Sequence, residues 1–109
     1  MDEIFQELAS LDKLIHEPAR LAIMTALMAC DNADFLFLQR LTGLTAGNLS
    51  VHLMRLEEAG MVATEKRFID RRPNTVARLT PAGKETILKY WSKMDELRKS
   101  SSSYNTRTE

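Results

Sequence analysis

The sequence predicts a mainly α-helical domain with a small β-hairpin, and three observations support this fold class. Apolar residues recur at helical spacing through most of the chain. Residues 61–79 instead alternate in polarity, which is typical of strands. Glycine and proline lie between these segments, where helices end or begin. The chain has 109 residues, which is the length of one domain.

Two helices are expected first. Residues from about Asp2 to Ile15 place Ile4, Leu8 and Leu11 on one face. Pro18 interrupts this pattern and suits the first turn of a second helix, from about Pro18 to Ala29. The second helix is apolar over a wide arc, so we expect it at the centre of the core.

A pair of short helices follows. Asp31–Asp34 is expected to be a loop. The apolar run that starts at Phe35 is expected to contain one or two strand residues first. It is then expected to continue as a short helix through Leu41. Gly43 suits a left-handed helix stop. Thr45 suits the N-cap of the next helix, which ends at Ala59–Gly60. The apolar residues of that helix are Leu49, Leu53 and Leu56.

The alternating segment predicts a hairpin with strands at Met61–Ile69 and Thr75–Leu79. The turn is expected at Asp70–Asn74, where Pro73 would stiffen it. The order of elements therefore predicts a winged helix-turn-helix, in which two helices joined by a tight turn precede a hairpin, the wing.

A last helix closes the domain, with Thr80 as N-cap and Pro81 in its first turn. It is expected to persist to about Lys99. We therefore expect one domain over residues 1–99 and a flexible tail over residues 100–109, which has no apolar face.

Two stretches carry a family resemblance: LTGLTAGNLSVHLMRLEEAGMV, Leu41–Val62, and KRFIDRRPNTVARLTPAGKETI, Lys66–Ile87. In this order they resemble the compact winged-helix DNA-binding domain family of the ArsR/MarR-type transcriptional regulators. The resemblance covers about Leu14–Leu88. It implies a DNA-binding regulator, expected to be a repressor, that has no catalytic residues and dimerises through its terminal helices.

The helix that begins after Thr45 is the expected DNA reader, because recognition helices touch base edges with their N-terminal half. Asn48 can bond adenine, Ser50 a base or a phosphate, and Arg55 a phosphate. His52 is either a phosphate contact or a capped surface histidine. Related sequences often have polar or basic residues at the places of Ala46, Val51 and Met54. Base recognition is therefore expected either to be thinner or to rely on apolar contact with thymine methyl groups. The predicted contacts of this helix are Thr45, Ala46, Gly47, Asn48, Ser50, Val51, His52 and Arg55.

Arginines at the hairpin tip predict contact with the minor groove, where the potential is most negative. The alternative is ordinary solvated charge. The predicted wing contacts are Lys66, Arg67, Arg71, Arg72 and Asn74. The net charge is zero, but residues 1–34 carry two basic and seven acidic residues, whereas residues 35–83 carry seven basic and four acidic ones.

The terminal helices have more apolar surface than one small domain is expected to cover. This predicts a homodimer interface that contains Leu8, Leu11, Ile87, Trp91 and Met94. The alternative is that the last helix packs only on its own core. A dimer would place its two half-sites about 34–36 Å apart on an inverted repeat.

Other classes of function are disfavoured. No apolar run is long enough for a bilayer, and the acidic N-terminus is unlike a signal peptide, so a cytoplasmic protein is expected. Cys30 is the single cysteine, and with His16 and His52 it makes no metal-ligand cluster. We expect no enzyme, cofactor or metal, and the effector ligand is unknown. A winged helix that binds only protein is the alternative function, which the apolar Val51 and Met54 favour.

Overall fold

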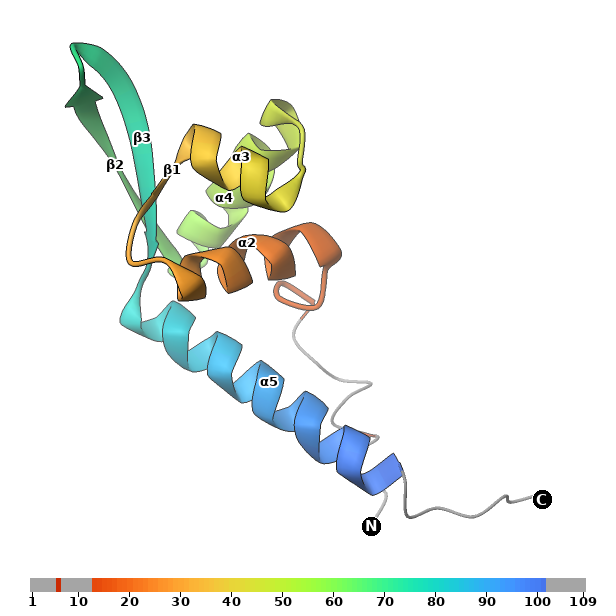
Figure 1. Ribbon diagram of the computed structural model, residues 1–109. Helices are drawn as coiled ribbons and strands as arrows, with labels where there is room; N and C mark the ends of the chain where they lie inside the picture. Colours follow the sequence, from red (N-terminus) through yellow and green to blue (C-terminus); the bar gives the residue numbers. More distant parts are fainter. Residues whose placement is uncertain (1–5, 7–12, 102–109) are drawn as a thin grey trace.

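The computed structural model describes residue 6 and residues 13–101 (Figure 1). The predicted mainly α-helical fold with a hairpin is confirmed. The elements, in chain order, are α2 (Pro18–Ala29), β1 (Ala33–Asp34), α3 (Phe35–Thr42), α4 (Ala46–Glu58), β2 (Val62–Ile69), β3 (Arg72–Leu79) and α5 (Pro81–Ser101).

Helix α2 lies at the centre of the domain, as its wide apolar arc predicts. It contacts α3, α4, α5 and β3. Figure 1 shows α3 and α4 on one side of α2 and α5 on the other. Ile23 and Met24 of α2 are completely buried. The buried core around them also contains Ile15, Leu27, Ala33, Leu38, Leu49, Leu53, Leu56, Val62, Ala77, Leu79, Ile87 and Tyr90.

The sheet is antiparallel with the strand order β1-β3-β2. Strand β1 pairs with β3 only at Val76 and Ala77, whereas β2 pairs with β3 from Val62–Leu79 to Ile69–Arg72. Most of the hairpin therefore has no third strand beside it, and Figure 1 shows it projecting from the helices.

The helix ends have local causes. The Glu17 carboxylate accepts from the Arg20 N–H at the start of α2, and Pro18 needs no partner in the first turn. The Asp34 carboxylate accepts from the Phe37 N–H at the start of α3. Gly43 ends α3 with a φ of 72°, which is the predicted left-handed stop.

Helix α5 is fixed against the turn that follows α4. The Thr80 N–H donates to the carbonyl of Met61 at 3.0 Å, and the Thr80 hydroxyl donates to the carbonyl of Gly60 at 2.6 Å. A Cβ on Gly83 would lie 2.0 Å from the Met61 oxygen, so only glycine allows this approach. Thr80 also accepts from the Gly83 N–H, as expected of an N-cap.

Two boundary predictions are wrong. The first expected helix does not reach Ile15, because Lys13–Ile15 form a turn whose carbonyls at Lys13 and Leu14 accept from the Arg20 guanidinium. The remainder of that helix, other than residue 6, lies outside the described residues. The expected loop at Asp31–Asp34 ends in strand β1, because Ala33 and Asp34 pair with β3.

Candidate nucleic-acid interface

The expected reader helix, α4, has one buried face. Leu49, Leu53 and Leu56 are at most 6% exposed and pack in the core. The Thr45 hydroxyl accepts from the Asn48 N–H at 3.2 Å, which confirms Thr45 as the N-cap. The helix begins at Ala46. The Thr45 cap fixes its start, and the buried leucines fix its inner face.

The outer face of α4 is small in its first two turns. A Cβ added to Gly47 would meet nothing within 4 Å. Val51 and Met54 are 43% and 54% exposed, so apolar surface lies beside the polar residues. The exposed set contains Thr45, Ala46, Gly47, Asn48, Ser50, Val51, Met54 and Arg55. The structure thus brings the predicted contacts of this helix together, with His52 at the edge of the set.

His52 is held by other side chains. Its Nδ1 lies 3.2 Å from Nη1 of Arg20 and 3.8 Å from Oε2 of Glu17, and its side chain is 20% exposed. This placement fits the capped histidine better than a phosphate contact. His16 packs against α5, where its Nδ1 lies 2.9 Å from the Tyr90 hydroxyl.

Arg20 is a functional candidate that sequence analysis missed. It is 8% exposed and joins three segments: the turn at Lys13–Leu14, the start of α2 at Glu17, and α4 at His52. A buried guanidinium with several partners fixes the relative placement of the groups it binds. The available signal was a lone charge within an apolar helix.

The turn at the wing tip is shorter than predicted. The turn contains only Asp70 and Arg71, with φ values of 52° and 66°, and the expected turn residues Arg72, Pro73 and Asn74 belong to β3. A two-residue turn with positive φ at both positions matches the twist of a hairpin. Pro73 therefore does not stiffen the turn.

Pro73 is tolerated on β3 for a geometric reason. It pairs with Phe68, next to the closing pair Ile69–Arg72, so a nitrogen at its position points away from β2. Strand β1 does not reach this part of β3. No ladder hydrogen bond is lost, and the tip keeps its register.

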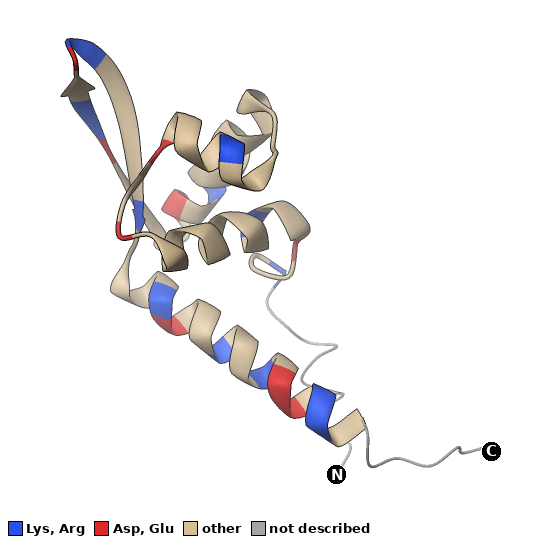
Figure 2. Cartoon of the chain, in the orientation of Figure 1, with Lys and Arg blue, Asp and Glu red and all other residues tan. Residues whose placement is uncertain are grey.

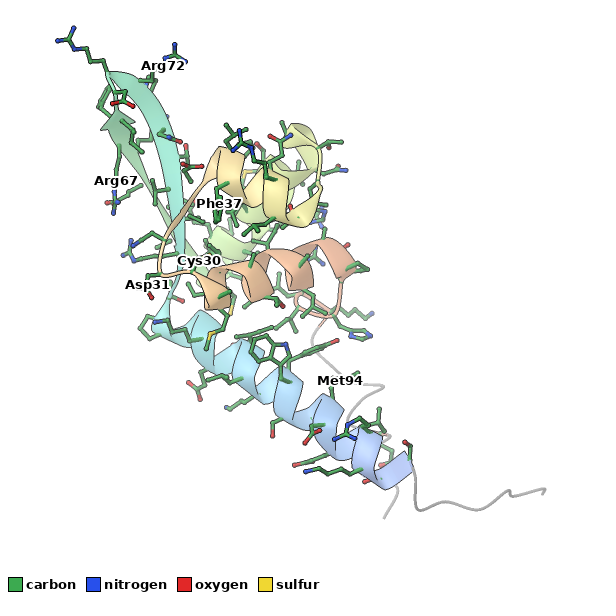
Figure 3. All side chains as sticks on the ribbon, viewed as in Figure 1. Cys30, Asp31, Phe37, Arg67, Arg72 and Met94 are labelled. Carbon is green, nitrogen blue, oxygen red and sulfur yellow. The ribbon has the colours of Figure 1, made fainter. Side chains whose placement is uncertain are left out.

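The cross-strand register divides the predicted wing contacts between the two faces of the hairpin. Lys66 lies on the face that begins with the buried Val62, whereas Arg67, Arg72 and Asn74 lie on the other face. Arg67 forms an ion pair with Glu65. Arg71 is in the turn itself. Figure 3 shows Arg72 near the tip and Arg67 farther down the hairpin.

Charge is concentrated unevenly on the described surface. Figure 2 shows basic residues at the hairpin tip and mixed signs along α5. Between Lys66 and Arg72 the chain has four basic residues and one acidic residue. The tip is therefore the part of the wing that attracts a polyanion.

The predicted dimer residues have different positions. Leu8 and Leu11 lie outside the described residues. Ile87 is completely buried in its own core, so its assignment to a dimer surface is wrong. Trp91 is 36% exposed, whereas Met94 is partly buried against the core. Leu88 is 49% exposed and was missed, although it precedes Trp91 by three residues on the same helix.

Over residue 6 and residues 13–101, no group of three metal-ligating side chains lies together. Cys30 is a free, half-buried thiol after α2. None of the described helices is both long and apolar enough to cross a membrane.

The comparisons with known proteins agree with this geometry. The family model of the winged helix DNA-binding domain matches residues 19–98. The chain belongs to the winged-helix DNA-binding domain family. An uncharacterized protein of Methanocaldococcus jannaschii is 33% identical over 78 residues, which are 72% of this chain and 85% of that protein.

Solved structures share the winged-helix fold. A transcriptional regulator homologue from Pyrococcus horikoshii OT3 is 33% identical, with a TM-score of 0.82 over 90% of this chain and 96% of that one. A mutant of MarR from E. coli is 19% identical, with a TM-score of 0.69 over 85% of this chain and 65% of that one. The fold is therefore that of the MarR-type regulators, and these matches are to regulators rather than to enzymes.

Proposed function

We propose that this winged-helix protein binds double-stranded operator DNA as a homodimer and represses transcription. The observation that carries the proposal is the small, exposed face of α4 beside a hairpin whose tip is basic. A helix needs this kind of face to approach base edges closely, and a wing needs positive charge to hold the backbone. Membership of the family and the likeness to a transcriptional regulator homologue support it.

In the proposed complex, α4 lies in the major groove, which is about 12 Å wide. Asn48 and Ser50 contact base edges, and the N–H groups at the start of α4 face a phosphate. Val51 and Met54 contact thymine methyl groups. Arg55 contacts the backbone. Arg71 and Arg72 hold the minor groove, where their charge is most favourable.

The homodimer is proposed to form through α5 together with the N-terminal segment. Leu88 and Trp91 expose apolar surface on α5, and Met94 lies farther along the helix, as Figure 3 shows. A two-fold interface there would set the separation of two α4 helices, so the operator would be an inverted repeat. The folded domain is proposed to extend to the end of α5 at Ser101, two residues beyond the expected boundary at residue 99, and the rest of the expected tail lies outside the described residues. The protein would repress by occupying its operator.

The test is selection of bound duplexes from a random pool, followed by fluorescence anisotropy at several salt concentrations. We expect an inverted repeat and an affinity that falls steeply with salt, because phosphate contacts release counterions. Asn48→Ala should relax the preference at one or two positions of each half-site, while Lys89→Ala on α5 should change nothing. Absence of duplex binding at low salt would contradict the proposal.

A protein-interaction module is the second candidate, favoured by the exposed apolar surface of Val51 and Met54. It predicts no enrichment of any duplex in the same selection. The selection therefore distinguishes the two functions.

A further inference from the structure

Phe68 is the most exposed of the large apolar side chains in the described part of the chain, at 79%. It lies on β2 directly before the last strand residue, Ile69, and opposite Pro73. A single exposed apolar residue needs no explanation, but here an aromatic ring and a proline form one apolar pair at a projecting tip.

The face of the hairpin that carries this pair can be followed from the core outward. It begins with Val62 and Leu79, which are buried. It continues with Thr64 and Thr75, which line a shallow hollow together with residues of α4 that include Ser50 and Met54. The Thr64 hydroxyl donates to the Glu57 carboxylate of α4 at 2.6 Å.

Beyond that hollow, the same face presents Lys66 and then Phe68 with Pro73. The apolar pair is thus continuous with the surface that joins the wing to the proposed reader helix. The charge of the tip identifies the occupant. Lys66 lies on the same face as Phe68, Arg71 lies in the turn, and Arg67 and Arg72 lie on the other face of the same tip, while Asp70 is the one acid between residues 66 and 72. Positive charge around a small apolar tip complements a nucleic-acid groove.

We propose that Phe68 is an apolar wedge that enters a minor groove of duplex DNA beside Arg71 and Arg72 and partly unstacks the base step that it contacts. This inference rests on the proposed function. An undistorted minor groove is about 6 Å wide, and the two strands of a hairpin alone lie about 4.8 Å apart. The tip and its side chains therefore enter only a widened groove. Apolar wedges produce this widening by unstacking a step and bending the duplex.

With a wedge, binding by the wing depends on how easily the contacted base step unstacks. Arginines alone do not provide this kind of sequence specificity. Pyrimidine–purine steps, above all TA and CA/TG, unstack most easily. We therefore expect one flexible step in the part of each half-site that the wing contacts, without a hydrogen bond to its bases.

The test uses the full chain and a duplex recovered from the random pool, with 2-aminopurine at the flexible step. Unstacking raises the fluorescence of this base analogue. We expect wild type and Phe68→Leu, which keeps a wedge, to raise the fluorescence on binding, and Phe68→Ala not to raise it. Phe68→Ala should also bind about tenfold more weakly, which is within the range of a base-contacting aromatic ring.

Two further variants, Arg72→Ala and Ile69→Ala, distinguish an effect of the wedge from an effect of charge and from an effect of apolar contact in general. Phe68→Ala should leave the salt dependence of the affinity unchanged, whereas Arg72→Ala should reduce its logarithmic slope by about one. Ile69→Ala removes an apolar side chain from the opposite face and should leave the fluorescence signal intact. The far-ultraviolet circular dichroism of Phe68→Ala should equal that of wild type, because the ring is exposed.

The two proposals fail in different ways. If wild type binds no duplex, the proposed function is wrong. If wild type binds a selected duplex but Phe68→Ala retains its affinity and its fluorescence signal, the wedge is wrong and the proposed function stands. Equal loss of signal in Phe68→Ala and Ile69→Ala would also overturn the assignment to the Phe68–Pro73 face.

Discussion

The two ends of the β2–β3 hairpin place similar residues in opposite surroundings. At the base, Val62 and Leu79 are 2% and 5% exposed, and both belong to the core. At the tip, Phe68 and Ile69 are 79% and 44% exposed. The base therefore stabilises the fold through burial of apolar surface, whereas the apolar tip contributes little to folding. Its residues are available for a contact outside the chain.

The backbone differs between the two ends as well. At the base, β3 lies between two strands, and the Thr80 hydroxyl bonds the carbonyl of Gly60. At the tip, Asp70 and Arg71 have positive φ without being glycine, which costs about 1 kcal/mol at each position. Backbone strain at such a place is a reason to look for a function of the residues that cause it.

The largest effect on the free energy of unfolding is expected when a side chain at the base of the hairpin is truncated. Leu79→Ala should lower the free energy of unfolding by about 3 kcal/mol, because it leaves a cavity in the core. Phe68→Ala should lower it by less than about 0.5 kcal/mol, because the ring is exposed. Urea unfolding of both variants measures the difference. Equal destabilisation would mean that the tip is part of the folded core.

The next effect concerns the close approach at the start of α5. Gly83→Ala should lower the free energy of unfolding by about 2 kcal/mol, because its Cβ would collide with the carbonyl of Met61. Gly47→Ala is the matched control, since a Cβ on α4 meets nothing within 4 Å and alanine favours a helix by about 1 kcal/mol.

Gly47→Ala also bears on DNA binding. The variant should be more stable than wild type in urea and yet bind the selected duplex more weakly, because the added methyl group lies on the face proposed to meet the groove. A more stable variant with unchanged affinity would place Gly47 outside the interface.

A smaller effect, on DNA affinity rather than on stability, is expected at the turn of the hairpin. Arg71→Gly should be at least as stable as wild type, because glycine adopts a φ of 66° without steric cost. It should bind DNA about fivefold more weakly and reduce the logarithmic salt slope by about one, through loss of one phosphate contact. Anisotropy titrations at several salt concentrations check both values. An unchanged slope would show that Arg71 does not contact the DNA.

The helix starts and stops could be predicted because their causes are local. Pro18, Gly43, Thr45 and Thr80 act on the backbone within a few residues, and the structure places each at the predicted helix end. The exposed face of α4 followed from the spacing of its leucines alone.

The remaining features depend on distant residues or on an unusual backbone. Strand β1 exists only because Ala33 and Asp34 meet β3, some forty residues farther along the chain. The two-residue turn lacked its usual Asn-Gly signal, so the prediction placed Arg72–Asn74 in the turn. Strand alternation put Phe68 on a definite face, but its exposure depends on how far the hairpin extends beyond the core.

The smallest effect on the free energy of unfolding is expected at Glu17. Its carboxylate caps α2 and lies 3.8 Å from the side chains of both Arg20 and His52. Burial raises the pKa of this carboxyl. The N–H groups of Arg20 and Ala19, together with the positive charges of His52 and Arg20, outweigh burial, so the pKa of Glu17 lies below its ordinary value of 4.5. Because the folded state lowers this pKa, the ionised carboxylate stabilises the fold above about pH 4.5, and the stabilisation disappears as pH falls through the lowered value.

Glu17→Gln keeps an oxygen that can cap the helix but removes the charge. It should lower the free energy of unfolding by about 0.5 kcal/mol at pH 7, since a charge at a helix N-terminus contributes about this much. The difference from wild type should shrink as pH falls below 4.5 and vanish once the carboxyl of the folded wild type is protonated. Urea unfolding at several pH values measures it. A difference that stays constant down to the lowest pH would show that the substitution perturbs the cap itself rather than the charge interaction with Arg20 and His52.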